Sequence, residues 1–248
     1  MLLSQLMKLN KPVISVVIPA YNEEKLLLKC IEALKNQKFD LPYEIIVVDN
    51  NSTDKTADIA RGQGVSVVFE KMKGIGAARQ RGIKAAKAKI IAQTDADSRP
   101  DENWLSEIYK ALDSNGNLIG VSGPSYCFKS NSKFKYKVVD AVFNFLAFRI
   151  TPLITKNMVF RGHNVAFRKD VLLKVGGYRT NIEYLEDADL NIRLKGFGQI
   201  KFNPKQIVYT SARRVEKLGA LRVLLFQILC SLKMLLQENP VITAEDIR

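Results

Sequence analysis

Residues Ile90–Ser98 read IIAQTDADS, an apolar run that ends in two aspartates, Asp95 and Asp97, one residue apart. Continuous apolar runs are typical of buried parallel strands, and ligands of open α/β sheets bind beyond the carboxyl ends of such strands. Alternation along a strand sends both carboxylates to the same side. Hard anionic oxygens in this arrangement suit Mg²⁺ or Mn²⁺ carrying a diphosphate. The alternative is a polar turn, because Asp, Ser and Pro are common turn residues.

The sequence before this stretch alternates between strand and helix patterns. Such alternation predicts an α/β fold with a Rossmann-like, mainly parallel sheet, built from right-handed βαβ crossovers and covered by helices on both faces. The expected strands are 13–19, 44–49, 65–69 and 90–94, and the expected helices are 23–35, 56–61 and 76–88.

The second half of the chain is less regular. Its expected elements are an aromatic and aliphatic region at 134–160, a strand at 159–168, helices at 169–175 and 186–195, and a long apolar helix at 218–236. The last of these is amphipathic, and it could lie in a membrane interface, pack on the core or contact a second subunit.

Composition narrows the classes of protein. With 248 residues and 47% hydrophobic content, the chain can bury a substantial core. No apolar run reaches the ~20 residues of a membrane span, and the N-terminus is too short and wrongly ordered for a secretory signal peptide. Three widely spaced cysteines indicate neither a disulfide framework nor a zinc site, and a single histidine, His163, excludes multi-histidine metal sites. These features fit a reducing cytoplasm.

The net charge of +13 is unevenly distributed. Residues 1–123 carry 17 basic and 15 acidic side chains, whereas residues 124–248 carry 21 and 10. The basic second half is expected to meet something anionic, for which a phospholipid surface, a lipid-linked phosphate and a nucleic acid are candidates. A merely solvated surface is the alternative.

A glycine-rich turn, Lys71–Arg79 (KMKGIGAAR), opens one of the expected helices. Backbone N–H groups around Gly74 and the positive end of the helix favour a bound phosphate. The turn does not match a dinucleotide fingerprint, because Arg79 stands where the third glycine of G-x-G-x-x-G belongs. A charged helix start at the surface is the alternative.

Four motifs occur in order: VVIPAYNEE at Val16–Glu24, VVDNNSTD at Val47–Asp54, DAD at Asp95–Asp97 and EDAD at Glu186–Asp189. Together they resemble the family 2 glycosyltransferases of GT-A fold, over roughly residues 12–215. The resemblance implies inverting transfer of a sugar from a nucleoside-diphosphate donor with a divalent metal.

We accordingly expect a single GT-A domain over 1–248. Its nucleotide-binding half is expected at 12–123, its acceptor-binding half at 124–212, and a basic and apolar C-terminal helix at 213–248. The Q-x-x-R-W motif of polymerising members is absent from the sequence.

The first strand is followed by a turn that suits a nucleoside. At Pro19, Ala20 and Tyr21 an aromatic ring can stack near a base while backbone groups bind it. The resemblance places Glu23 near the nucleoside, although a glutamate at a helix start also complements the helix dipole.

The second strand ends in Asp49, whose carboxylate can accept hydrogen bonds from a ribose or a base edge. Many relatives have a second Asp at the next position, where this chain has Asn50, which keeps an acceptor but loses the charge. By resemblance, Arg79 and Lys73 approach the nucleotide, and Gly74 lies beside them.

Carboxylates in two motifs are expected to carry the reaction. Asp97 is the first choice as a metal ligand. Asp95 is the second candidate for the metal, and its other expected roles are contact with the ribose and orientation of the ligand. Inversion needs a base that takes a proton from the acceptor hydroxyl. The resemblance assigns this role to Asp187, with Glu186 as the second candidate, while Asp189 complements the helix terminus. For all three, helix N-terminal charge is the alternative.

Two further segments, 161–164 and 213–214, are expected to bind the acceptor or a phosphate. The segment 161–164 matches a family stretch, and its histidine either binds a hydroxyl or phosphate or is structural. The two arginines at 213–214 could bind the donor diphosphate or a lipid phosphate. The candidates are Arg161, Gly162, His163, Asn164, Arg213 and Arg214.

The sequence therefore predicts a cytoplasmic glycosyltransferase, associated with the inner membrane surface through its basic half. Its partners would be a nucleotide sugar and a glycan or lipid-linked acceptor, with no nucleic acid. A nucleotidyltransferase is the alternative enzyme, but its Gly-rich basic loop after the first strand is absent. A basic nucleic-acid or membrane-binding module is the non-enzymatic alternative, and it leaves the strand-end carboxylates unexplained.

Overall fold

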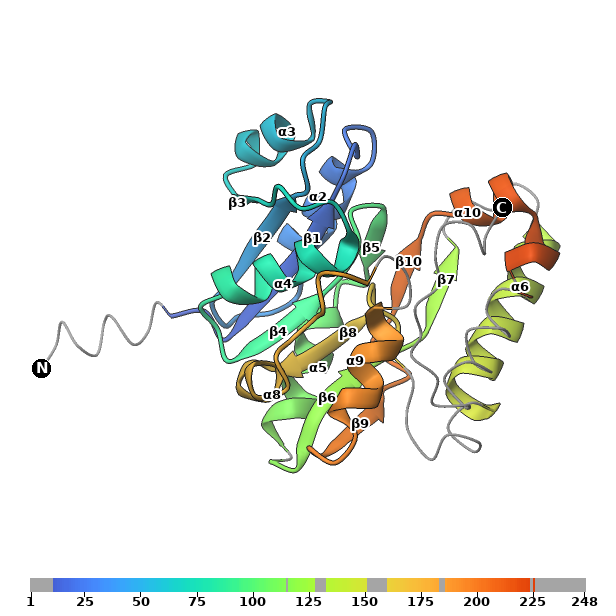
Figure 1. Ribbon diagram of the computed structural model, residues 1–248. Coiled ribbons are helices and arrows are strands. Elements are labelled where there is room, and N and C mark those ends of the chain that lie inside the picture. Colours follow the sequence, from blue (N-terminus) through green and yellow to red (C-terminus); the bar gives the residue numbers. More distant parts are fainter. Residues whose placement is uncertain are drawn as a thin grey trace, which may run out of the picture.

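The computed structural model describes residues 11–114, 116–127, 133–150, 160–182, 186–223 and 225. Within them the main sheet has the strand order β3-β2-β1-β4-β8-β6-β9 (Figure 1). Its first four strands are mutually parallel, as the sequence predicts. They are β1 (Ile14–Ala20), β2 (Tyr43–Asp49), β3 (Ser66–Phe69) and β4 (Ile90–Gln93).

The other half of the sheet contains a strand of reversed direction. β8 (Val165–Arg168) runs antiparallel to both β4 and β6 (Leu118–Ser122), and β9 (Gln199–Phe202) runs parallel to β6. The strand expected at 159–168 begins only at Val165, because the Asn164 N–H donates to the Arg161 carbonyl and closes a turn before it.

A second, smaller sheet lies beside the main one (Figure 1). It contains β5 (Ser98–Pro100), β10 (Val208–Thr210) and β7 (Ser125–Cys127), in that order. The residues after Asp97 therefore form a strand, and they tie the aspartate motif to a segment more than a hundred residues further along the chain.

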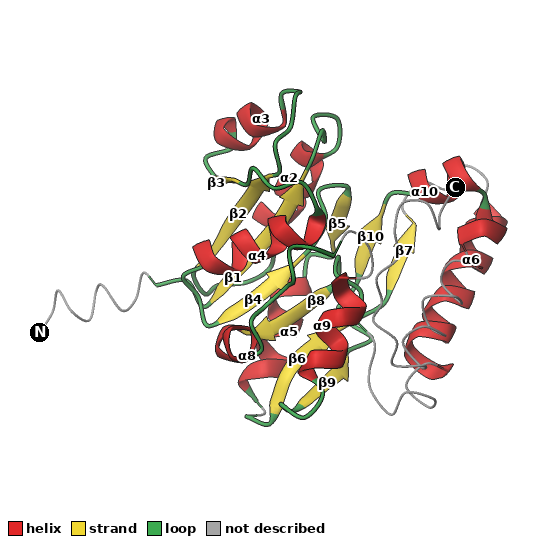
Figure 2. Cartoon of the chain, in the orientation of Figure 1, coloured by secondary structure: helices red, strands yellow, loops and turns green. Residues whose placement is uncertain are grey.

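Helices cover both faces of the main sheet, as expected (Figure 2). One face packs against α2 (Leu27–Lys35), α3 (Thr56–Gly62) and α5 (Trp104–Asp113). The other packs against α4 (Ile75–Ala85), α8 (Lys169–Lys174) and α9 (Glu186–Leu194). Trp104 of α5 is fully buried in the core on the first of these faces.

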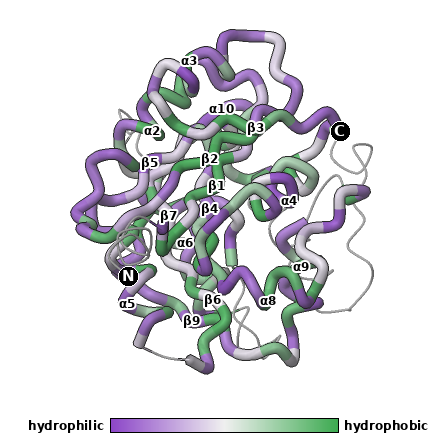
Figure 3. The backbone as a smooth tube through the Cα atoms, turned by 90° about the vertical axis from the view of Figure 1, so that its left-hand side faces the viewer, coloured by the Kyte–Doolittle hydropathy of each residue, from purple (hydrophilic) through white to green (hydrophobic). Residues whose placement is uncertain are grey.

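The core explains the apolar runs in the sequence. On β1, Val16 and Ile18 face one helix layer and Val17 faces the other, so consecutive residues are all buried. Figure 3 shows the hydrophobic segments concentrated along these central strands. Helix α4 approaches the sheet closely, since a Cβ at Gly82 would lie 2.2 Å from Val17 Cγ1.

The start expected for the first helix is wrong, for a local reason. The helix expected from residue 23 starts at Leu27, because the N–H groups of Glu23 and Glu24 donate to side chains of the 54–56 turn. The helix expected at 218–236 lies largely outside the described residues. A short α10 (Arg213–Leu218) precedes it and ends where Gly219 adopts a φ of +82°.

The second half also contains α6 (Lys133–Phe145), which continues into a π-helical segment at Leu146–Ile150. In the described part of the chain, no helix has the length and apolar character needed to cross a membrane. Cys30 and Cys127 are free thiols, and Cys230 lies outside the described residues.

Candidate active site

A pocket of about 430 Å³ opens beyond the carboxyl ends of β1, β2 and β4, where strand-end logic predicts a ligand. It is lined by Pro19, Ala20, Tyr21, Glu23, Asn50, Lys73, Gly74, Ile75, Ala78, Asp95, Ala96, Asp97 and Arg213. The turn after β1, the glycine-rich turn and the aspartate motif therefore meet at one cavity, together with Arg213 from the start of α10.

An aromatic ring and a cation lie together in the pocket wall. The Lys73 ammonium is 5.5 Å from the centre of the Tyr21 ring, and Tyr21 remains 47% exposed. An exposed ring offers a flat surface to a nucleobase, and the ammonium offers a charge to a phosphate.

Side chains join the turns that follow β1 and β2. The Asn22 side-chain oxygen accepts a hydrogen bond from the Thr53 N–H at 2.8 Å, and the Thr56 hydroxyl accepts one from the Glu23 N–H at 2.8 Å. Asn22 and Asn51 adopt left-handed φ angles of 54° and 62°, which asparagine tolerates better than most residues. This pairing fixes the position of Glu23 and was not foreseen from the sequence.

Asn50 shapes the loop that carries Lys73. Its Nδ2 donates to the carbonyls of Glu70 and Met72, at 3.1 and 2.6 Å, and its Oδ1 accepts from the Gly74 N–H at 2.9 Å. A carboxylate has no hydrogen to donate, so the asparagine found where many relatives carry Asp matches these two carbonyls. Gly74 has a φ of 131°, a conformation that favours glycine.

Asp49 is buried outside the pocket lining, and its Oδ1 accepts a hydrogen bond from the Ser52 N–H at 3.2 Å. In this structure it therefore shapes the turn after β2.

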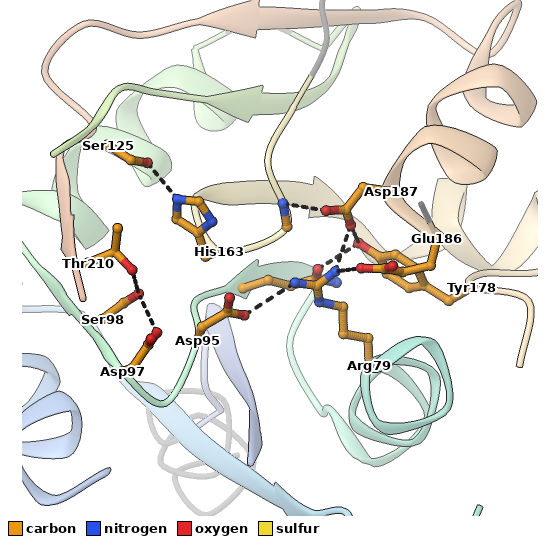
Figure 4. Close-up of polar contacts among 12 residues, drawn as sticks. Arg79, Asp95, Asp97, Ser98, Ser125, His163, Tyr178, Glu186, Asp187 and Thr210 are labelled. Carbon is orange, nitrogen blue, oxygen red and sulfur yellow. Dashed lines mark hydrogen bonds and ion pairs between the residues drawn. The ribbon is translucent and has the colours of Figure 1, made fainter. Parts of the chain in front are cut away.

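Arg213 bridges two acidic groups of the pocket. Its Nη2 is 2.7 Å from Glu23 Oε1 and 2.9 Å from Asp97 Oδ2. Burial raises the pKa of Glu23, and the arginine partly offsets that rise. The other carboxylate oxygen of Asp97, Oδ1, lies 3.5 Å from the Ser98 hydroxyl. That hydroxyl in turn lies within hydrogen-bond distance of the Thr210 hydroxyl, at 3.1 Å (Figure 4).

Asp95 and Asp97 fit a divalent cation that takes its remaining ligands from a diphosphate and water. Both carboxylates line the pocket and are partly exposed, with 30% and 20% of their side-chain surfaces accessible. Within the described ranges, no group of three or more His, Cys, Asp or Glu side chains is arranged to hold a metal. One or two carboxylates plus substrate phosphates is the usual donor set for Mg²⁺ at phosphate-transferring sites.

A second acidic cluster surrounds Arg79, next to the first (Figure 4). Its Nη1 is 2.5 Å from Glu186 Oε1 and 2.7 Å from Asp187 Oδ1, while its Nη2 is 3.2 Å from Asp95 Oδ1. Arg79 is only 2% exposed and is not among the lining residues of the pocket. Burial alone would lower its pKa, but the charges of Asp187 and its neighbours raise it.

The two carboxyls at the start of α9 have raised pKa values. Burial and the charge of Asp187 raise the pKa of Glu186 to about 7. Burial also raises the pKa of Asp187, against the opposing effects of Arg79 and of the Gly162 N–H, which donates to Asp187 Oδ2 at 2.8 Å. A raised pKa suits a carboxylate that accepts a proton during a reaction.

Tyr178 closes this cluster and was missed from the sequence. Its hydroxyl donates to Gln93 Oε1 at 2.7 Å and lies 3.4 Å from Asp187 Oδ1. The sequence offered one signal for this contact: Gln93 is a polar residue at the end of the otherwise apolar strand β4, and a buried polar side chain there needs a hydrogen-bond partner. Asp189, in contrast, pairs with Arg179 and Arg193, in line with its expected role at the helix terminus.

The segment Arg161–Asn164 has mixed roles. The His163 Nε2 lies 2.8 Å from the Ser125 hydroxyl (Figure 4). Arg161 lies over the Phe148 ring, at 6.0 Å, and burial lowers its pKa to about 10.

Asn164 does not face an acceptor. It is fully buried, and its amide bonds Trp104 Nε1 and the carbonyls of Pro124 and Gln206. The acceptor role expected for it therefore gives way to a structural one, since its hydrogen-bonding groups are taken up inside the protein. The Arg214 side chain lies outside the described part of the chain.

The fold that carries this strand-end pocket, aspartate pair and second acidic cluster matches solved structures of glycosyltransferases of GT-A type. A mannosyltransferase from Pyrobaculum calidifontis, solved with GDP-Man and Mn²⁺, shares this fold. The TM-score is 0.63 at 21% identity, over 88% of this chain and 64% of that one. Glucosyl-3-phosphoglycerate synthase from Mycobacterium tuberculosis, solved with Mn²⁺, UDP and phosphoglyceric acid, matches with a TM-score of 0.60 at 22% identity, over 92% and 79%.

The chain belongs to glycosyl transferase family 2, whose family model matches residues 15–176. It is 29% identical over 183 residues to the glycosyltransferase AglE of Haloferax volcanii, which covers 69% of this chain. The chain spans 57% of the length of that relative.

Proposed function

We propose that this protein transfers a sugar, with inversion, from a nucleoside-diphosphate sugar to an acceptor hydroxyl or lipid-linked phosphate, using Mg²⁺ or Mn²⁺. The observation that carries this proposal is the shared guanidinium of Arg79, which contacts both Asp95 and Asp187. One planar guanidinium thereby holds two carboxylates: Asp95, which suits the diphosphate side, and Asp187, which suits proton removal.

The pocket supports a nucleotide as the donor's leaving group. Tyr21 and Lys73 offer a stacking face and a cation, and the amino end of α4 directs backbone N–H groups toward a phosphate. Asp97 and Asp95 would hold the cation, which when bound neutralises charge on the departing diphosphate. The bound nucleotides and Mn²⁺ of the two structural neighbours support this assignment.

In the proposed reaction, Asp187 removes the proton from the acceptor hydroxyl as its oxygen attacks the anomeric carbon. The bond between that carbon and the diphosphate oxygen breaks, and its electron pair leaves with the nucleoside diphosphate. Attack from the face opposite the leaving group inverts the anomeric configuration. Glu186 is the second candidate for the base, because it contacts the same nitrogen of Arg79, Nη1, as Asp187 does.

The acceptor is proposed to bind the 124–212 half, and the basic residues of 124–248 are proposed to hold the enzyme at the cytoplasmic face of a membrane. The charge imbalance supports this, with 21 basic against 10 acidic side chains. Flotation with vesicles containing anionic lipid, compared with neutral vesicles, tests the membrane contact. Equal recovery with both would refute it.

The test of the proposed function is incubation with a panel of UDP- and GDP-sugars, Mn²⁺ and candidate acceptors. Release of nucleoside diphosphate, together with a product of opposite anomeric configuration by NMR, is the expected result. Release of pyrophosphate would instead indicate a nucleotidyltransferase, and a product with retained configuration would refute the inverting mechanism.

A further inference from the structure

Arg79 lies in α4, just after the cationic, glycine-rich turn, yet it does not line the pocket, and its guanidinium contacts the acidic cluster of Asp95, Glu186 and Asp187 (Figure 4). We propose that Arg79 is a positioning residue: its guanidinium sets the distance between the Asp187 carboxylate and Asp95. This role rests on the proposed function and names a residue that acts through Asp187.

The protein builds a tight enclosure around this guanidinium. On one side lies Gly162, where an added Cβ would come within 2.2 Å of both terminal nitrogens of Arg79. The Tyr178 ring lies 5.6 Å from the guanidinium carbon. Gly162 and Tyr178 also reach Asp187, through the N–H bond at 2.8 Å and the hydroxyl at 3.4 Å. The same two residues therefore confine both the arginine and the carboxylate that it holds.

The contacts divide between the two ends of the guanidinium. Nη1 binds Asp187 and Glu186 at the start of α9, and Nη2 binds Asp95 beyond the end of β4. Because the guanidinium is planar and rigid, its two nitrogens fix the relative placement of the carboxylates they bind. Lysine supplies the same charge at one point and cannot span both ends.

These contacts argue against Arg79 as a phosphate ligand. The side chain is 2% exposed, and its charge is matched by three carboxylates. A phosphate would have to displace one of them and enter a buried space. The two roles predict different kinetics, since a phosphate ligand governs donor affinity whereas a positioning residue governs turnover.

Two variants disturb the guanidinium in independent ways. Arg79→Lys keeps the buried positive charge but removes the planar group that contacts Asp187 and Asp95 at the same time. Gly162→Ala keeps every charged group and pushes the guanidinium aside. The matched control is Arg81→Lys on the exposed face of the same helix. Thermal melts verify that all three proteins are folded.

Steady-state kinetics and nucleoside-diphosphate binding with Mn²⁺ form the readout. Both test variants should lose about 100-fold in kcat, the effect of roughly 1 Å misplacement. Nucleotide affinity and donor KM should change far less than kcat, because Asp97, the first-choice metal ligand, pairs with Arg213 and not with Arg79. The Arg81 control should match the unmodified protein.

Loss of nucleotide affinity with kcat preserved would overturn the positioning role in favour of a phosphate contact. An unchanged kcat in both variants would refute the positioning role of Arg79 but would leave the proposed function intact. If the unmodified protein binds nucleotide but transfers no sugar to any acceptor, the proposed function and the positioning role fall together.

Discussion

Arg213 and Asp97, 116 positions apart in the sequence, form an ion pair of 2.9 Å in the wall of the donor pocket. The same arginine nitrogen contacts Glu23 at 2.7 Å. The guanidinium thus takes up a carboxylate oxygen that the proposed divalent cation would use, so we expect the two cations to compete for Asp97.

Replacing this internal cation should strengthen metal binding in the absence of nucleotide. Arg213→Gln is expected to raise the affinity for Mn²⁺ alone by a few-fold, because ion pairs this exposed contribute about 1 kcal/mol or less. Isothermal titration with Mn²⁺ measures the change, with Arg61→Gln at a surface ion pair as control. Unchanged or weaker Mn²⁺ binding would contradict the competition.

Removal of the first-choice metal ligand should abolish metal-dependent donor binding. Asp97→Ala is expected to lose the Mn²⁺-dependent thermal shift with nucleoside diphosphates, since a principal oxygen ligand is gone. The fold should remain, because Asp97 is partly exposed and lies in the turn before β5. Asp58→Ala, at an exposed helix position, is the control. A normal shift in Asp97→Ala would reject the assignment.

Asp187→Asn separates binding from turnover. The amide keeps the size of the side chain but cannot accept the acceptor proton, so kcat should fall by about 10²- to 10⁴-fold. The affinity for the nucleotide with Mn²⁺ should hardly change, since Asp187 is not in the pocket lining. Asp170→Asn, an exposed acid on α8, serves as control. Full turnover by Asp187→Asn would exclude it as the base.

Stability should depend on pH through Glu186. Its pKa in the folded protein is about 7, raised from 4.5, so the folded state holds a proton that the unfolded state has released. The group's contribution to stability is therefore fully present below pH 4.5 and is lost as pH rises through about 7.

Glu186→Gln removes this titration. The variant should melt at a higher temperature than the unmodified protein at pH 8, by an amount equivalent to roughly 1–3 kcal/mol. The difference should shrink toward acidic pH. Melting curves at pH 5, 6, 7 and 8 measure it, and a difference that is constant across this range would rule out Glu186 as its source.

Asn50→Asp tests the loop that carries Lys73. The carboxylate would face two backbone carbonyls without a hydrogen to donate, which should cost about 1–3 kcal/mol of unfolding free energy. Nucleotide binding should weaken as well, because the carbonyls of Glu70 and Met72, in the loop that leads to Lys73, would lose their donor. Denaturant titration and nucleotide binding check both effects, with the exposed Asn36→Asp as control. Equal stability would contradict the role of the amide.

Strand-end reasoning placed Asp95, Asp97 and Tyr21 at one cavity because it depends only on the local direction of parallel strands, whereas Lys73 was placed there by the family resemblance. It could not foresee the reversed direction of β8, since a four-residue strand carries no sequence mark of its partner. That reversal brings the 161–164 turn over the acidic cluster.

The family resemblance predicted that Arg79 approaches the nucleotide, whereas the structure pairs it with an acidic cluster and leaves it out of the pocket lining. A cation beside glycines favours a phosphate contact when only neighbouring residues are visible. Its actual partners, Glu186 and Asp187, lie more than a hundred residues away, and the space that it fills exists because residue 162 has no side chain. Contacts of this kind depend on packing between distant segments, and no local pattern records them.

The crowding of Asp95, Glu186 and Asp187 around one guanidinium has a consequence for directed evolution. Buried like charges repel one another, so neutral replacements at this cluster relieve strain that the active protein retains. A library of variants screened only for survival after heating would therefore favour an amide at residue 186, whether or not those variants still transfer a sugar. Screens for robust forms of this protein need to score turnover and heat resistance in the same round.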